Sequence, residues 1–142
     1  MKIKEAYPPN FGAIKTAFPI ETTIPIYPYG DTVYNPSKVE IPADILYHEH
    51  IHLEQQEREG SAALWWTKYI HDIGFRLDQE LEAYAKQYLW VKKHLNSKIA
   101  KENLQEGAEH LSSEVYMLEL TIEEAGTMIR KEAKKYRDLF VV

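Results

Sequence analysis

The sequence predicts an α+β fold, in which a small N-terminal antiparallel β-sheet is followed by about four α-helices. The prediction starts from proline usage, because six of the seven prolines precede Pro42 and none follows it. Residues 1–41 contain short β-rich runs, whereas residues 42–142 are rich in Glu, Lys, Leu and Ala with helical periodicity. A chain of 142 residues that is 44% hydrophobic can bury one sizeable core. We therefore expect a single domain over residues 1–142.

The β-rich region contains two candidate strands, residues 22–27 and 32–34, which are rich in Thr, Ile, Val and Tyr. A Tyr-Gly-Asp sequence at residues 29–31 indicates a turn between them. Prolines at positions 25 and 28 cannot donate to a central ladder. We therefore expect the first strand to lie at a sheet edge or to end there.

The first predicted helix spans residues 42 to about 59. It opens on a proline, which suits the first helical position, and Gly60 suits its C-terminal cap. The second helix begins either near Ala62 or after Gly74, and its most regular part is residues 76–94.

Two further helices are predicted in the last third of the chain. An Asn-Ser pair at residues 96–97 indicates a break, and the third helix covers roughly residues 99–118. Thr121 and Glu124 form a capping box that opens the fourth helix, which we expect to end around residue 137.

Composition excludes several classes of protein. The formal charge of −5 leaves no basic surface for a phosphate backbone, so nucleic acid is not expected as a partner. No run of about eighteen apolar residues exists that would span a membrane. The polar start carries no apolar signal region, so we expect a cytoplasmic protein. With no cysteine, any metal must be held by His, Asp or Glu.

His48 and His52 are four residues apart and enclose Glu49. On a helix the two imidazoles project from one face, about 40° apart, and can reach one tetrahedral ion. Glu49 is offset by about 100°, where a carboxylate can touch a water on the metal without ligating it. This is the H-E-x-x-H motif of zinc hydrolases, in which the ion acidifies its water and the glutamate takes the proton.

Alternative interpretations of these histidines follow from the backbone conformation. His50 points about 200° away from His48 on a helix, so we assign it a structural role. On a strand His48, His50 and His52 would share one face, but residues 53–59 favour a helix. Without a metal, His48 and His52 would be ordinary hydrogen-bonding histidines.

A catalytic zinc ion usually keeps three protein ligands and one open position. The segment at residues 76–85 offers Asp78, Glu80 and Glu82 as the third ligand. Glu82 lies about 200° round the helix from Glu80, so only one of those two can face the ion.

A helix-borne H-E-x-x-H motif followed by a helix with a Glu-x-Glu-Ala element resembles the gluzincin branch of the zincin metallopeptidases. The chain is more closely similar to small phage-encoded metallopeptidase domains, in which a β-rich start leads into a His-Glu-x-x-His-x-x-Gln motif, here residues 48–55. The likeness covers roughly residues 20–95. It implies a zincin-like fold, with His48 and His52 as Zn²⁺ ligands, Glu49 as general base and Glu80 as third ligand.

The apolar face of the second helix favours the same third ligand. Leu77, Leu81 and Tyr84 mark a buried face; Glu80 lies within that arc, and Glu82 lies nearly opposite Glu80.

The oxyanion donor of such an enzyme is not determined by the sequence. His71, His110 and Tyr116 are candidates only because their side chains can donate a hydrogen bond.

Two segments have both a functional and a structural interpretation. The cluster of Trp65, Trp66, Tyr69 and Ile70 could cover a substrate groove, although such clusters are more often core. Residues 31–34 could be the edge strand that holds a peptide substrate, or one strand of an ordinary hairpin.

Three functions are therefore weighed. The first is a zinc-dependent metallopeptidase that acts on a peptide or protein. The second is a non-catalytic, zinc-stabilised binding or structural module, such as a phage accessory protein. The third is a helical interaction protein that binds no metal. Glu49 favours catalysis, because a structural site needs no base beside its metal. The substrate and the oligomeric state are not determined by the sequence.

Overall fold

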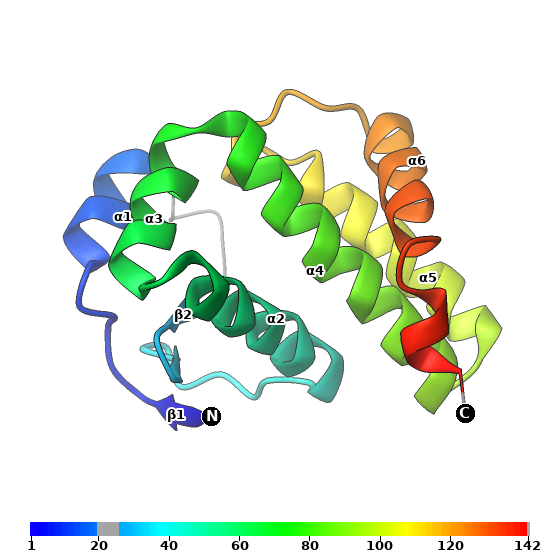
Figure 1. Ribbon diagram of the computed structural model, residues 1–142, viewed down its shortest axis with the longest axis horizontal. Helices are drawn as coiled ribbons and strands as arrows, with labels where there is room; N and C mark the ends of the chain where they lie inside the picture. Colours follow the sequence, from blue (N-terminus) through cyan, green and yellow to red (C-terminus); the bar gives the residue numbers. More distant parts are fainter. Residues whose placement is uncertain (20–25, 142) are drawn as a thin grey trace. The chain divides into compact units, whose positions relative to one another are not determined.

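The computed structural model describes residues 1–19 and 26–141. In these ranges the chain is a mixed α+β protein with one three-stranded sheet and six α-helices, so the predicted class is confirmed and the predicted number of helices is wrong. The fold has two compact units, residues 1–79 (unit 1) and residues 80–142 (unit 2). The boundary falls inside the continuous helix α4 (Ile73–His94; Figure 1).

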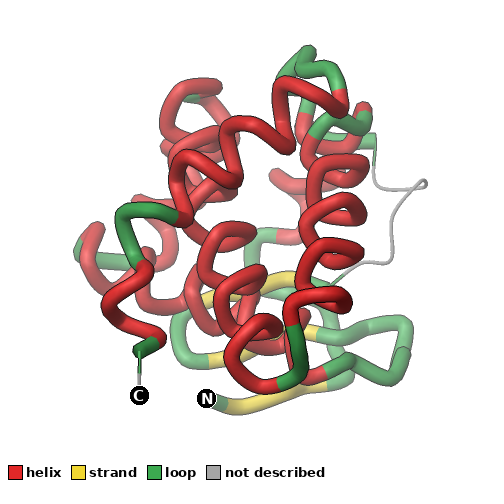
Figure 2. The backbone as a smooth tube through the Cα atoms, turned by 90° about the vertical axis from the view of Figure 1, so that its right-hand side faces the viewer, coloured by secondary structure: helices red, strands yellow, loops and turns green. Residues whose placement is uncertain are grey.

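The sheet of unit 1 contains β1 (Lys2–Lys4), β2 (Tyr27–Tyr29) and β3 (Thr32–Tyr34) in the order β1-β3-β2 (Figure 2). The predicted hairpin is confirmed, because β2 and β3 pair antiparallel and Gly30 takes a left-handed φ of 70° in the turn. β2 is also an edge strand, as its proline requires. Residues 22–25 of the first predicted strand lie outside the described residues.

One prediction about this sheet is wrong, and one of the two interpretations of residues 31–34 is excluded. β1 pairs parallel with β3, so the sheet is mixed rather than antiparallel. Its three residues, Lys-Ile-Lys, are all exposed, so no buried face holds the strand in place; backbone bonds such as Lys2 N–H to the Asp31 carbonyl, 2.8 Å, do so instead. β3 is paired on both sides, so residues 32–34 cannot be a free edge for a substrate strand.

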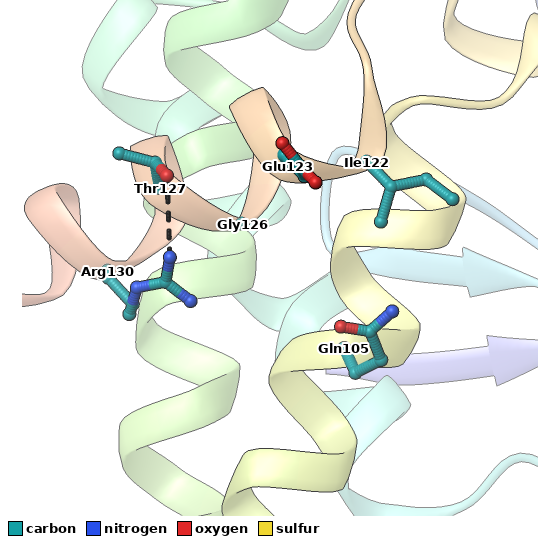
Figure 3. A pocket seen from close by; sticks show the side chains of 6 residues that line it. All are labelled: Gln105, Ile122, Glu123, Gly126, Thr127 and Arg130. Carbon is teal, nitrogen blue, oxygen red and sulfur yellow. Dashed lines mark hydrogen bonds between the residues drawn. The ribbon is translucent and has the colours of Figure 1, made fainter.

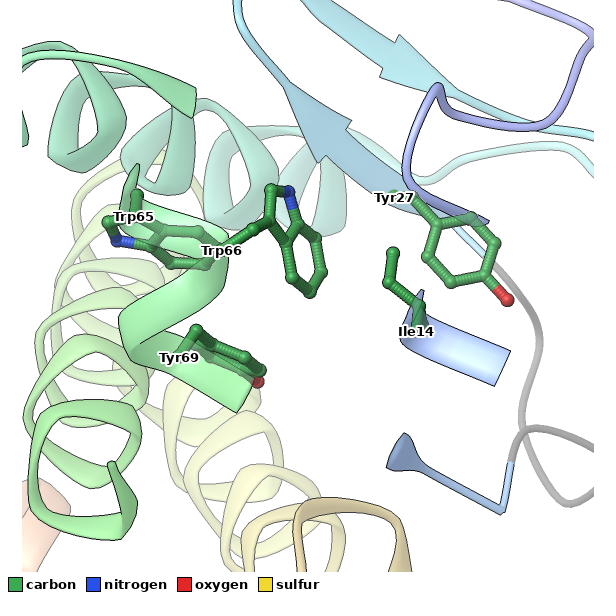
Figure 4. Close-up of a cluster of buried hydrophobic side chains, with 5 residues drawn as sticks. All are labelled: Ile14, Tyr27, Trp65, Trp66 and Tyr69. Carbon is green, nitrogen blue, oxygen red and sulfur yellow. The ribbon is translucent and has the colours of Figure 1, made fainter. Parts of the chain in front are cut away.

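An unpredicted helix, α1 (Phe11–Ala17), lies in the proline-containing region and buries a single residue, Ile14. This isoleucine joins an aromatic cluster with Tyr27 of β2 and three residues of α3 (Ala62–His71) (Figure 4). Those residues are Trp65, Trp66 and Tyr69, which are all buried. The interpretation of the tryptophan segment as core is therefore confirmed.

The helix that carries the histidine motif, α2 (Ala43–Glu59), packs against α3, β2 and β3. It ends at Gly60, whose φ of 106° confirms the predicted glycine cap. Buried Gln56 donates to the Pro28 carbonyl at 2.9 Å and accepts from Gly30 N–H at 2.7 Å. The indole N–H of Trp66 donates to the same carbonyl at 2.9 Å. The Pro28 carbonyl oxygen of the hairpin therefore accepts hydrogen bonds from both α2 and α3.

Asp72 divides the second predicted helix into α3 and α4. Its backbone is extended, with φ −121° and ψ 105°, which ends α3. Its carboxylate then accepts the N–H of Phe75 at 3.0 Å, in the first turn of α4. The Ser61 hydroxyl opens α3 by accepting from Leu64 N–H at 3.0 Å. Both possible starts of the predicted second helix therefore correspond to real helix starts, α3 at Ala62 and α4 two residues before the predicted position.

Unit 2 contains the rest of α4 together with α5 (Ser97–Leu111) and α6 (Ile122–Ala133), which pack on each other. α5 ends earlier than predicted because the hydroxyls of Ser112 and Ser113 bond back to the carbonyls of the last turn. Short 3₁₀ helices follow, η2 (Glu114–Tyr116) after α5 and η3 (Arg137–Phe140) after α6.

The predicted capping box at the start of α6 is confirmed, since Thr121 and Glu124 bond to each other's backbone N–H at 3.0 Å. In the described part of the chain, none of the helices has the length and apolar composition needed to cross a membrane.

Candidate metal centre

Helix α2 places His48 and His52 on its buried side, with exposed fractions of 6% and 3%. Their four-residue spacing superposes the two imidazoles on one face, and their Nε2 atoms lie 3.1 Å apart. Two nitrogens bound to one tetrahedral zinc ion, each at 2.0–2.1 Å, are about 3.3 Å apart. The two rings are thus close to the geometry that a shared ion requires.

Glu80 is the third potential ligand in this place. One ligand atom each from His48, His52 and Glu80 lies within 4.8 Å of the other two, and all three residues are buried. Glu80 follows Gln79, the last residue of unit 1, on the same turn of α4. Among the described residues, His48, His52 and Glu80 are the group of His, Asp and Glu side chains whose spacing suits a metal ion. Two imidazoles and one carboxylate are a donor set found in catalytic zinc sites.

The other two carboxylates of this segment are placed differently. Asp78 is exposed. Glu82 is buried and forms an ion pair with Lys86 at 2.8 Å, one turn further along the helix. The structure therefore brings Glu80, rather than Asp78 or Glu82, to the two histidines. That the three act as metal ligands stays a prediction.

The two remaining residues of the motif differ in burial. Glu49 is half-buried, and its Oε2 atom is shielded from solvent. The side chain of His50 is 45% exposed and lies 3.3 Å from the Glu54 carboxylate, one turn further along α2. His50 is not part of the three-residue group, in keeping with the structural role expected for it.

A glutamine that the motif contains, but for which the sequence indicates no role, supports His52. Gln55 is 2% exposed, and its Oε1 lies 2.8 Å from His52 Nδ1. Its Nε2 donates to the backbone carbonyl of Gln79 at 2.9 Å. In the sequence, only the helical spacing of three residues indicates the contact between Gln55 and His52. The contact between Gln55 and Gln79 joins residues 24 positions apart and has no such indication.

Trp65 encloses the same imidazole from α3. Its ring centroid is 5.3 Å from that of His52, and its indole N–H donates to Gln79 Oε1 at 2.8 Å. Because Trp65 is 1% exposed, it packs against the histidine rather than offering a surface to a substrate.

The suggested oxyanion donors do not belong to the three-residue group. His71 and His110 are exposed, and the Tyr116 hydroxyl shares a 2.6 Å hydrogen bond with the Tyr84 hydroxyl. The identity of the donor therefore stays undetermined.

A pocket of about 640 Å³ lies at α5 and α6 in unit 2 (Figure 3). Its wall includes Thr127 and Arg130, whose side chains are hydrogen-bonded at 3.4 Å. Glu123 supplies its single carboxylate, and none of the three potential ligands lines it. We therefore do not assign this pocket to the candidate metal centre.

Comparisons of the chain with protein-family models, with curated proteins and with solved structures found no match.

Proposed function

We propose that this protein is a zinc-dependent metallopeptidase with a zincin-like arrangement, in which His48, His52 and Glu80 hold one Zn²⁺ ion. The observation that carries the proposal is the 3.1 Å approach of two histidine Nε2 atoms beside a buried glutamate. Two imidazoles and one carboxylate gathered in a buried place are a donor set that a single divalent cation can bind.

The chemistry that the ion would supply is an acidified water and a polarised peptide carbonyl. Glu49 would accept the proton of that water, because its position beside His48 on α2 lets it approach without ligating. His52 would be held in place by Gln55 and Trp65. The substrate would be a peptide or protein, since this is the reaction that a base next to a His-His-Glu set serves in the zincins that the motif resembles.

A second candidate function is a zinc-stabilised module without catalysis. The observation that favours it is burial, because His52 and Glu80 are each only 3% exposed. A structural zinc site is closed, whereas a catalytic one keeps a position open to substrate. Glu49 distinguishes the two functions, since only catalysis needs its carboxylate.

The experiment compares the parent protein with Glu49→Gln and His48→Ala. Each is purified without added metal and assayed for zinc content and for hydrolysis of unfolded casein. We expect about one zinc per chain in the parent and in Glu49→Gln, and little in His48→Ala. Hydrolysis should fall about 10²- to 10⁴-fold in Glu49→Gln, the usual contribution of a general base.

The controls decide between the candidates. His50→Ala should match the parent in both assays, because its side chain lies outside the group. Zinc in the parent without any hydrolysis that depends on Glu49 would favour the structural module. A parent that folds but takes up no zinc, even from a buffered excess, would overturn both zinc proposals.

A further inference from the structure

We propose that Gln55 is a positioning residue, oriented by the Gln79 backbone carbonyl, that fixes His52 in the tautomer with its proton on Nδ1. Nε2 is then the ring atom left with a lone pair. The consequence for metal binding rests on the proposed function, whereas the tautomer itself does not.

The orientation of the Gln55 amide follows from its partner on α4. A backbone carbonyl can only accept a hydrogen bond, so the atom of Gln55 that lies 2.9 Å from the Gln79 oxygen must be the NH₂ group. The carbonyl oxygen of the amide must then face His52 Nδ1, at 2.8 Å. A reversed amide would set two oxygens against each other at Gln79.

The tautomer follows from the orientation. An amide oxygen accepts and cannot donate, so the Nδ1 atom that faces it at 2.8 Å must carry the hydrogen. In a neutral imidazole the other nitrogen is then bare. That nitrogen is Nε2, the atom that approaches His48 Nε2 at 3.1 Å. The backbone of α4 therefore determines, through one side chain, which atom of His52 is offered to a ligand.

Burial makes this arrangement hard to replace by water. Gln55 and His52 are 2% and 3% exposed, and a buried polar atom that loses its partner costs about 1–3 kcal/mol. The side chain of Gln79 is also held, because its Oε1 accepts from the Trp65 indole N–H. Hydrogen bonds of this kind to a ligating histidine commonly change metal affinity by about 10- to 100-fold.

The chain offers a matched control in the next residue. Gln56 is equally buried, at 1%, and also makes a donor and an acceptor bond across the fold. Its partners are the hairpin atoms of Pro28 and Gly30, and not a histidine. Gln55→Met and Gln56→Met therefore remove the same chemical group at the same depth, with and without contact to His52.

The first measurement uses the metal-free full-length protein. Long-range ¹H–¹⁵N NMR at mildly alkaline pH reports which ring nitrogen of each histidine carries the proton, and the loss of a signal in His52→Ala assigns His52. We expect His52 with the proton on Nδ1 in the parent and in Gln56→Met, and a shift towards Nε2 protonation in Gln55→Met. Gln55→Glu loses the bond to the Gln79 carbonyl but should keep the Nδ1 proton, because either oxygen of a carboxylate accepts from it. A His52 protonated on Nε2 in the parent, or unchanged in Gln55→Met, would overturn the proposal.

The second measurement is the dissociation constant for Zn²⁺ alone, by competition with a chelator. We expect it to rise about 10- to 100-fold in Gln55→Met, with Gln56→Met staying close to the parent. Equal losses in the two variants would overturn the link between the tautomer and metal binding. If the parent binds no zinc but its NMR spectra behave as expected, the proposed function fails and the role of Gln55 stands. If Gln55→Met does not fold, the parent spectrum and Gln55→Glu still decide.

Discussion

The inner side of α2 and the contact between α5 and α6 are both buried, but they are built from opposite kinds of residue. The buried residues of α5 and α6 are all small or aliphatic, namely Ala100, Leu104, Gly107, Ala108, Leu111, Ala125, Gly126, Ile129 and Ala133. α2 instead buries only two apolar side chains and four polar ones. The polar ones are His48, His52, Gln55 and Gln56. Packing alone explains the first region and does not explain the second.

The two regions differ in what their burial requires. Alanine, leucine and glycine bury without cost in hydrogen bonds, so α5 and α6 need nothing beyond close approach. Polar side chains inside a fold each need a partner. Gln55 bonds to His52 on its own helix and to the backbone of Gln79, and Gln56 bonds to the backbone of the β2–β3 hairpin. His48 and His52, the α2 residues of the proposed metal centre, belong to this polar set.

The largest expected effect is the stabilisation of the folded chain by zinc, which should depend on the polar residues of α2. If zinc binds only the folded chain, as the proposed site implies, zinc at about 1,000 times its dissociation constant should raise the free energy of unfolding by about 4 kcal/mol. A chelator should remove this gain in the parent and have no effect on His52→Ala. Denaturant unfolding with and without zinc measures the difference. An equal response to zinc in His52→Ala would mean that the ion binds elsewhere.

A smaller effect should distinguish two glycines where α5 and α6 pack. A Cβ at Gly107 would lie 3.0 Å from Tyr84 Cδ1, and that ring is held by its bond to Tyr116, so Gly107→Ala should cost about 1–3 kcal/mol. A Cβ at Gly126 would meet Ala108 Cβ at an ordinary 3.6 Å. Gly126→Ala should therefore be neutral or stabilising by up to about 1 kcal/mol. Thermal and urea unfolding measure both, and zinc affinity should change in neither.

The smallest effect at neutral pH concerns Tyr27 in the aromatic cluster. Burial, with a lesser contribution from the charge of Tyr7, raises its pKa from 10.0 to about 12. The folded chain then keeps a proton that the unfolded chain loses, so this stability is complete below about pH 10 and is lost as the pH rises towards 12. Tyr27→Phe should unfold less readily than the parent across that window and show a flatter pH profile. Parallel profiles of the two proteins would contradict the shift.

The parts of the fold that were predicted correctly depend on signals within a few residues. The capping box at Thr121 and the glycine cap at Gly60 are local patterns, and the structure has both. The spacing of His48 and His52 is local too, and it brings their rings together as a helix must.

The parts that were missed depend on contacts between distant segments. β1 is only three residues long and fully exposed, and it is held by pairing with a strand about thirty residues later, which only the tertiary structure supplies. The division of α3 from α4 was ambiguous, since Asp72 is both a tolerable helix residue and a good cap. The role of Gln55 was not visible because its orientation is set by the Gln79 carbonyl, which has no side-chain signature.

The shared acceptor at Pro28 has a consequence for how unit 1 assembles. Its carbonyl binds Gln56 and Trp66, which are 28 and 38 residues further along the chain. A hairpin of two three-residue strands is marginal by itself, so β2 and β3 become stable only when both helices have closed these long loops. Such non-local contacts slow folding and make it cooperative. The sheet should therefore form late and be lost together with α2 and α3, rather than fraying as a separate element.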